Sequence, residues 1–88
     1  MPEREVQIVN KLGIHARPAA EIVKTAGKFR SNITIMRDDL EVNAKSIMGV
    51  MMLAAECGAT IVLRAIGEDA DAALDALATV IGNKFGER

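Results

Sequence analysis

The sequence predicts an α+β fold, a two-layer open-faced sandwich with the element order βαββαβα. Short segments that alternate apolar and polar residues indicate strands with one face on a core. Segments with apolar residues at helical spacing lie between them, and their stripes are wide enough to cover one face of a sheet. We therefore expect a four-stranded, mostly antiparallel sheet with three helices on one face and water on the other. The 88 residues have room for one domain, residues 1–88.

Four segments have the alternation of strands. They are residues 5–9, 32–36, 40–43 and 60–66. Asp38 and Asp39 separate the second segment from the third and are typical of a hairpin turn. The fourth segment has the strongest strand pattern, and Gly67 ends it. If a right-handed crossover joins the first two strands with the last strand between them, the chain forms a split β-α-β unit.

Three segments have the spacing of helices. The first follows Pro18 and is expected to end at Gly27. The second, residues 47–55, follows Ser46. The third begins at Glu68, and acidic residues in its first turn suit the positive end of a helix dipole. Its predicted inward stripe consists of Ala70, Leu74, Leu77, Ala78 and Ile81.

The composition excludes several classes of function. Lys and Arg total 11 against 12 Asp and Glu, which leaves no broad positive surface for nucleic acid or an anionic membrane. Two Phe are the only aromatic residues, so the stacking platforms of an RNA-binding α+β domain are missing. No apolar run approaches the ~20 residues of a membrane span. Because the lone Cys57 also fits a reducing compartment, we expect a cytoplasmic protein without membrane insertion.

The single histidine limits the chemistry further. Cys57 has no second histidine to act as its base, which excludes a Cys/His catalytic site. It ends an apolar segment, where we expect a buried structural thiol. One histidine without a Cys/His cluster cannot supply the three or four ligands of a zinc site, so no metal is expected.

The segment from Gly13 to Pro18 lies where a loop becomes a helix. Proline is tolerated in a first helical turn, so Ala16 and Pro18 indicate the helix start. A helix N-terminus offers a phosphate unpaired N–H groups and a partial positive charge. There His15 supplies a nucleophilic nitrogen and Arg17 a permanent planar cation. The residues predict a phosphohistidine site, and the competing interpretation is an ordinary solvated helix terminus.

Residues 13–19 (GIHARPA) resemble the active-site signature of the HPr family, the histidine-containing phosphocarriers of the bacterial phosphoenolpyruvate:sugar phosphotransferase system. Residues 43–50 (NAKSIMGV) resemble the second signature of that family, around a regulatory serine. The spacing of the two segments, the element order and the length also agree. The resemblance therefore covers essentially the whole chain and implies a single phosphocarrier domain.

This resemblance implies a transfer reaction. His15 would accept a phosphoryl group on Nδ1 from phosphorylated enzyme I and donate it to enzyme IIA domains for sugar uptake. Arg17 would neutralise charge during the transfer. The protein would then be a carrier with a transient phosphohistidine rather than a turnover enzyme. No cofactor is implied beyond the covalent phosphoryl group.

Ser46 precedes an apolar helix and is typical of an N-cap. The resemblance implies a second role, as the target of an ATP-dependent serine kinase/phosphorylase. Phosphate there would add roughly −1.5 to −2 charges at a helix N-terminus, which favours the helix locally. The expected effect is therefore electrostatic and concerns the docking of partners.

The helix after Ser46 is apolar nearly all round, which is unusual on a small domain. Val50 and Leu53 are expected to face the sheet. The methionines suit either an adaptable docking surface or core filling, and both interpretations stay open at this point. Matching positions in the resembling family favour docking. The candidate partner-binding residues are Ala20, Lys24, Ile47, Met48 and Met51.

Two interpretations outside the sugar-transport role remain. A paralogue of the nitrogen-related phosphotransferase branch, or a serine-phosphorylated co-effector of a transcription regulator, would have a similar sequence. Such a protein would act through protein–protein interaction. We expect a monomer, because a carrier must expose its site to successive partners. Arg37 and Lys45 are expected to be solvated surface charges.

Overall fold

The computed structural model describes residues 2–87 and confirms the predicted fold class and element order. The strands are β1 (Glu3–Gln7), β2 (Asn32–Arg37), β3 (Leu40–Asn43) and β4 (Thr60–Ile66). The helices are α1 (Ala16–Ala26), α2 (Ile47–Met52) and α3 (Ala70–Gly82). A short 3₁₀ turn at Lys84–Gly86 follows α3. Within residues 2–87, none of the helices has the length and apolar character that crossing a bilayer requires.

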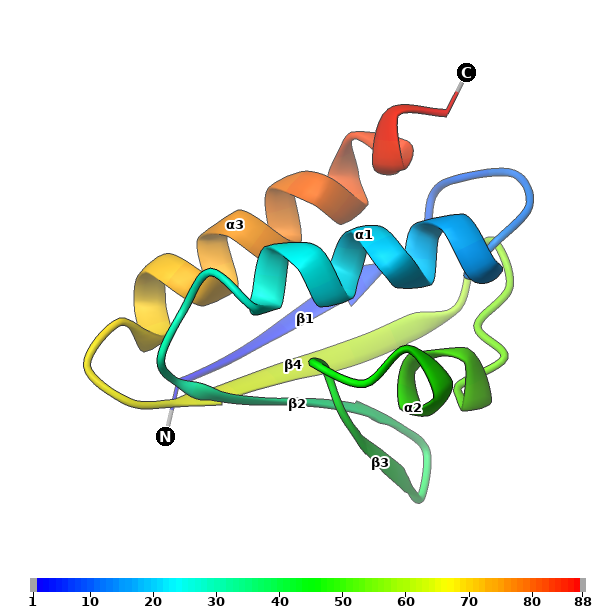
Figure 1. Ribbon diagram of the computed structural model, residues 1–88. Coiled ribbons are helices and arrows are strands. Elements are labelled where there is room, and N and C mark those ends of the chain that lie inside the picture. Colours follow the sequence, from blue (N-terminus) through cyan, green and yellow to red (C-terminus); the bar gives the residue numbers. More distant parts are fainter. Residues whose placement is uncertain (1, 88) are drawn as a thin grey trace.

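The strands form one sheet in the order β1-β4-β2-β3, and every pairing among them is antiparallel. Because β4 lies between β1 and β2, the unit β1-α1-β2 is the split β-α-β unit that the sequence predicts. Ile35 of β2 lies opposite Leu63 of β4 and Val42 of β3, and all three side chains are buried. The three helices lie on this face of the sheet (Figure 1).

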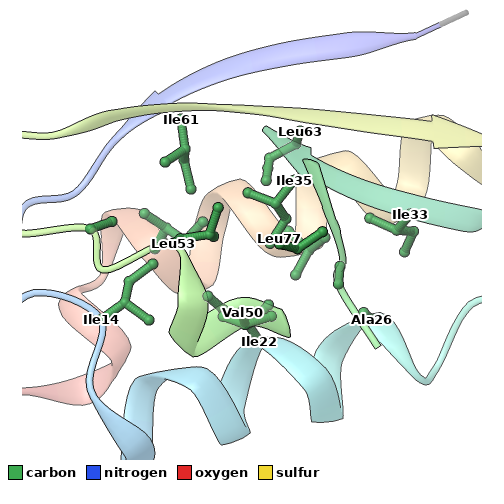
Figure 2. Packing of buried hydrophobic residues seen from close by; sticks show 14 of the residues in the cluster. Ile14, Ile22, Ala26, Ile33, Ile35, Val50, Leu53, Ile61, Leu63 and Leu77 are labelled. Atoms are coloured by element: carbon green, nitrogen blue, oxygen red, sulfur yellow. The ribbon is translucent and has the colours of Figure 1, made fainter. Parts of the chain in front are cut away.

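The core is aliphatic and joins all three helices to the sheet. Ile22 of α1, Val50 of α2 and Leu77 of α3 are fully buried. Figure 2 shows these side chains pointing toward Ile35 and Leu63 of the sheet. Of the predicted inward stripe of α3, four residues are buried and the fifth, at position 78, is half-buried. The other isoleucines that are fully buried, apart from those already named, are Ile8, Ile61 and Ile81.

Five element boundaries differ from the prediction. β1 spans Glu3–Gln7 rather than residues 5–9, because its pairing with β4 covers these residues. β2 continues one residue further than predicted, to Arg37, which pairs with Leu40 of β3. α2 ends at Met52 rather than at residue 55, since Ala54 adopts a left-handed φ of 47°. α3 begins at Ala70, two residues later than predicted, because the preceding Asp69 is non-helical.

Cys57 is exposed, so the expectation of a buried structural thiol is wrong. The chain leaves α2 before this residue, and the turn at Cys57 and Gly58 lies at the surface. Ala55 and Ala59, on either side of the turn, are buried instead. The apolar run therefore enters the core with its alanines and not with the thiol.

Arg37 is not the freely solvated charge that the sequence suggests. Its guanidinium donates hydrogen bonds to the carbonyl oxygens of Leu53 (3.1 Å) and Ala54 (2.8 Å), just beyond the end of α2. Its Nη2 also donates to both carboxylate oxygens of Glu56, at 2.7 and 3.0 Å, and this hydrogen bonding lowers the pKa of Glu56 from its ordinary value. Arg37 thereby ties the C-terminal end of α2 to the end of β2.

Asp69 ties the start of α3 to the segment before β2. Its carboxylate accepts hydrogen bonds from the Ser31 hydroxyl and from the backbone N–H groups of Arg30 (2.8 Å) and Ser31 (3.0 Å). It makes no cap to its own helix, whose first turn holds Asp71 as its acidic residue. The hydrogen bonds from the Ser31 hydroxyl and from Arg30 lower the pKa of Asp69 below its ordinary value of 3.8.

Replacing Asp69 by Asn should flatten the acid limb of the stability curve. Because its folded-state pKa lies below the unfolded value, the folded protein binds this proton more weakly than the unfolded chain does. The contribution of Asp69 to the free energy of unfolding is complete at pH values above the unfolded pKa of 3.8. It is lost as the pH falls from there through the folded-state pKa. Urea unfolding over this pH range measures it, with the exposed Asp39→Asn as the control. If the unfolding free energy of wild type and of Asp69→Asn changed equally with pH, the lowered pKa would not belong to Asp69.

Candidate functional site

His15 is the N-cap residue of α1. Its backbone is extended (φ −109°, ψ −168°), and its carbonyl oxygen accepts the first helical hydrogen bond, from Ala19 at 2.9 Å. The helix thus begins within two residues of Pro18, as predicted. Pro18 itself is buried in the first turn, where its missing N–H leaves no donor unpaired.

The loop before His15 is fixed by a close backbone approach. Gly13 has a left-handed φ of 70°, and a Cβ there would lie 2.6 Å from the carbonyl oxygen of Ala55. The next residue, Ile14, donates from its backbone N–H to that same oxygen at 2.8 Å. The buried Asn10 side chain donates to the carbonyl oxygen of Gly13 at 2.6 Å. Glycine is therefore required at position 13 for both its φ and its lack of a side chain.

The start of α1 is positively polarised. The N–H groups of Ala16 and Arg17 precede the first helical hydrogen bond and so have no acceptor within the helix. The side chain of His15 does not cap them, and the first turn holds no acidic residue. An anion near this end of the helix would meet two free N–H groups and the positive end of the helix dipole.

The His15 ring is half-exposed, and its polar partner among residues 2–87 is Glu87. Its Nε2 lies 3.0 Å from Oε2 of Glu87, whose side chain is 19% exposed against 41% for the histidine. An ionised carboxylate only accepts hydrogen bonds, so this contact assigns the ring proton to Nε2. The lone pair is then on Nδ1, which has no hydrogen-bond partner among residues 2–87.

His15 opens into a shallow pocket of about 430 Å³. Its other lining residues are Lys11, Leu12, Arg17 and Glu87. The guanidinium of Arg17 is exposed and forms no ion pair with any residue from 2 to 87. A nucleophilic nitrogen, two cations and free N–H groups thus share one open site, which can hold a dianion.

The structure brings together the predicted site residues His15, Ala16, Arg17 and Pro18. Sequence reasoning missed three others, Lys11, Leu12 and Glu87. Lys11 and Leu12 lie in the predicted loop, but nothing in their spacing distinguishes them from solvated loop residues. Glu87 is 72 residues away from His15 in the chain. No group of three or more His, Cys, Asp or Glu side chains suited to a metal ion occurs in residues 2–87.

Ser46 is the N-cap of α2, which confirms its structural interpretation. Its backbone is extended, and its Oγ accepts a hydrogen bond from the N–H of Gly49 at 3.1 Å. The residue is half-buried. The regulatory role of Ser46 remains a prediction.

We call the predicted partner-binding residues the docking face. They are Ala20 and Lys24 of α1 and Ile47, Met48 and Met51 of α2, and all five are exposed. Among the three docking-face residues on α2, Met48 is the most exposed, at 78%. Val50 and Leu53 point into the core as predicted (Figure 2), so the methionines on the outer side are not core filler. Met52, 65% exposed, extends the apolar surface beyond the predicted set.

Comparison with known proteins agrees along the whole chain. Residues 2–83 match the family model PTS-HPr, described as "PTS HPr component phosphorylation site". The phosphocarrier protein HPr of Cupriavidus necator is 49% identical over 87 residues, which cover 99% of this chain and 98% of that protein. The phosphocarrier protein NPr of Shewanella violacea is 45% identical, with 97% and 93% covered.

Solved structures give the same result. The crystal structure of HPr-C-His from Thermoanaerobacter tengcongensis has a TM-score of 0.95 and 49% identity, covering 100% of this chain and 99% of that one. An HPr dimer from the same organism has a TM-score of 0.79 at 49% identity, covering 99% and 100% of the two chains. The fold described above is therefore found in solved HPr structures.

Proposed function

The chain belongs to the HPr family of phosphocarriers, and from that premise we propose that His15 accepts a phosphoryl group from phosphorylated enzyme I and passes it to enzyme IIA domains for sugar uptake. The observation that carries this proposal is the different contacts of the two nitrogens of the His15 ring. Nε2 is engaged by Glu87, while Nδ1 has no partner among the described residues. The nitrogen that the family resemblance implies as the acceptor is thus the one with a lone pair.

The surroundings of His15 support transfer by positioning and fixed positive charge. A phosphoryl group on Nδ1 would lie at the N-terminus of α1, next to the free N–H groups of Ala16 and Arg17. The exposed Arg17 guanidinium can pair with its oxygens. Such preorganised donors stabilise the charge that develops during transfer, and the proposal needs no metal or cofactor on this protein.

The docking face supports a role with several partners. It presents apolar, flexible methionines beside a lysine, a combination that can repack against different surfaces. Ser46 lies at the N-terminus of the helix that carries three of these residues. Its phosphorylation would add negative charge at this edge, and we propose that a serine kinase/phosphorylase uses it to control docking.

We also propose that the protein acts as a cytoplasmic monomer. A carrier must present one site to a donor and then to an acceptor, which favours a free surface around His15. Light scattering at working concentration checks the oligomeric state. A stable dimer in solution would contradict this part of the proposal; the crystal structure of the relative from T. tengcongensis is described as a dimer.

A nitrogen-related branch is the second candidate function, because an NPr is among the similar proteins. Its physical chemistry at His15 would be the same. The difference lies in the acceptor, so phosphate flow from the phosphorylated protein to a sugar enzyme IIA, compared with a nitrogen-related acceptor, separates the two. Faster transfer to the nitrogen-related acceptor would overturn the sugar-transport role.

The proposed donor step is tested with purified components. Incubation with phosphoenolpyruvate, magnesium and enzyme I should add one acid-labile phosphoryl group per chain, detected by intact mass. Omission of enzyme I is the control and should leave the mass unchanged. A chain that remains unmodified beside an active enzyme I, or a label that survives acid, would refute the phosphocarrier function.

Met48→Glu should weaken the encounter with enzyme I. The substitution removes an apolar contact from the expected interface and places a charge there. We therefore expect a KM about tenfold higher with kcat nearly unchanged. The matched control is Ile66→Glu, which places the same charge at an exposed apolar residue of β4, outside the docking face. Steady-state phosphorylation kinetics measure both variants. Equal KM values for the two would show that α2 is not the docking helix.

A further inference from the structure

Glu87 reaches His15 through an unusual backbone path. Lys84, Phe85 and Gly86 have consecutive left-handed φ values of 57°, 55° and 78°. Such values are strained for the two residues that are not glycine, and strain of this kind persists where the surroundings hold it. The Phe85 side chain, 8% exposed, anchors the turn in the core. The turn follows α3 and places Glu87 in the pocket.

Both oxygens of the Glu87 carboxylate are held. Oε2 accepts from Nε2 of His15 at 3.0 Å, and Oε1 accepts from Nδ2 of Asn10 at 3.2 Å. Asn10 is fully buried and also donates to the carbonyl oxygen of Gly13 at 2.6 Å. One amide group therefore fixes both the loop that carries His15 and the carboxylate that meets its ring.

We propose that Glu87 is a positioning residue for phosphoryl transfer at His15, an inference that rests on the proposed function. The carboxylate holds the ring proton on Nε2, so that Nδ1 keeps its lone pair. It also fixes the rotation of the ring, because Asn10 holds the other oxygen of the same carboxylate. A carboxylate on the far nitrogen of a histidine sets the tautomer and stabilises the imidazolium in the same way at hydrolase sites.

The transfer step balances without an added acid or base. The Nδ1 lone pair forms the new N–P bond. The N–P bond of the donor, a phosphoimidazole protonated on its other nitrogen, breaks. Its electron pair returns to the donor nitrogen, which leaves as a neutral imidazole. The His15 ring gains one positive charge while its proton stays on Nε2, where the Glu87 carboxylate offsets that charge. When an acceptor then attacks the phosphorus, the cationic His15 ring leaves as a neutral imidazole, which makes it a better leaving group than an uncharged ring would be.

Glu87→Gln tests the proposal with little change of shape. The glutamine amide can accept from Nε2–H or donate to an unprotonated Nε2, so it no longer selects one tautomer. It also carries no charge to offset the imidazolium. Long-range ¹H–¹⁵N spectra of the unphosphorylated proteins should show one tautomer in wild type and a mixture in the variant. Glu68→Gln, an exposed carboxylate before α3, is the charge-matched control.

Single-turnover phosphorylation by phosphorylated enzyme I provides the second readout. Loss of one charge-assisted hydrogen bond at a partly exposed site predicts a transfer rate about 5- to 10-fold lower for Glu87→Gln. Glu68→Gln should match wild type. Thermal unfolding of all three proteins separates this effect from loss of structure, and an equal Tm is expected.

The outcomes distinguish this inference from the function on which it rests. Equal rates and equal ring spectra for wild type and Glu87→Gln would overturn the positioning role while leaving the carrier function intact. A slower variant with an unchanged ring spectrum would also overturn it, since the tautomer is the claimed cause. A wild-type protein that takes up no phosphoryl group would refute the carrier function instead.

Discussion

His15→Ala should reduce the acid-labile phosphoryl group added by enzyme I to an undetectable level. The chain has one histidine, so no second imidazole can replace it. The fold should be unaffected, because the half-exposed ring does not cap α1 and contacts one polar side chain in the part of the chain that the structure describes, that of Glu87. We expect the free energy of unfolding to change by less than about 0.5 kcal/mol, as for surface substitutions in general.

Intact mass after incubation and urea unfolding measure the two quantities on the same sample. Cys57→Ala is the matched control, since the exposed thiol is the other soft nucleophile at the surface. It should incorporate as much phosphate as wild type. Incorporation that survives in His15→Ala and disappears in Cys57→Ala would move the site to the thiol and refute the mechanism.

Leu77→Ala should have the largest effect on stability. The side chain is fully buried on α3 and lies between the helices and the sheet (Figure 2). Removing three carbons there loses their transfer free energy and leaves a cavity, which predicts a loss of about 3–4 kcal/mol. For a domain of this size that is a large part of the total stability.

Urea unfolding followed by circular dichroism measures the loss. Leu12→Ala removes the same atoms from a side chain that is 72% exposed, so its unfolding free energy should fall by less than about 0.5 kcal/mol. Similar losses for the two variants would contradict the placement of the core. A loss below about 1 kcal/mol in Leu77→Ala would do the same.

Local patterns in the sequence predict most of the fold. The period-two alternation of residues 60–66 fixes which side chains of β4 face the core, and the bounds of this strand are as predicted. Leu74, Leu77 and Ile81 follow helical spacing and are all buried. Ser46 predicts an N-cap because its hydroxyl needs only the backbone of the following turn, the N–H of Gly49, as its partner.

The errors concern contacts between distant segments. Arg37 ties the end of α2, although the sequence suggests a solvated surface charge. Asp69 binds the N–H groups before β2, although the sequence places it among the acidic residues that suit the dipole of the third helix. Cys57 is exposed because a turn after α2 faces outward. Such positions depend on how elements pack, and hydrophobic periodicity carries no signal for them.

The same reason explains what could be predicted of the candidate site. His15 and Arg17 are recognisable because a loop, a proline and a helix start lie together in the sequence. Glu87 joins them only through the left-handed turn after α3, far along the chain. Gly86 is a local hint of that turn, but the two preceding residues, Lys84 and Phe85, are ones that rarely adopt a positive φ.

The central claim is that the phosphoryl group is carried by Nδ1 of His15. Because the chain has one histidine, ¹⁵N labelling of histidine gives signals from a single ring, and its coupling to ³¹P in the phosphorylated protein identifies the bonded nitrogen. We expect phosphorus coupled to Nδ1 and a proton retained on Nε2. Phosphorus coupled to Nε2, or a phosphorylated protein whose ring nitrogens show no coupling, would contradict the account.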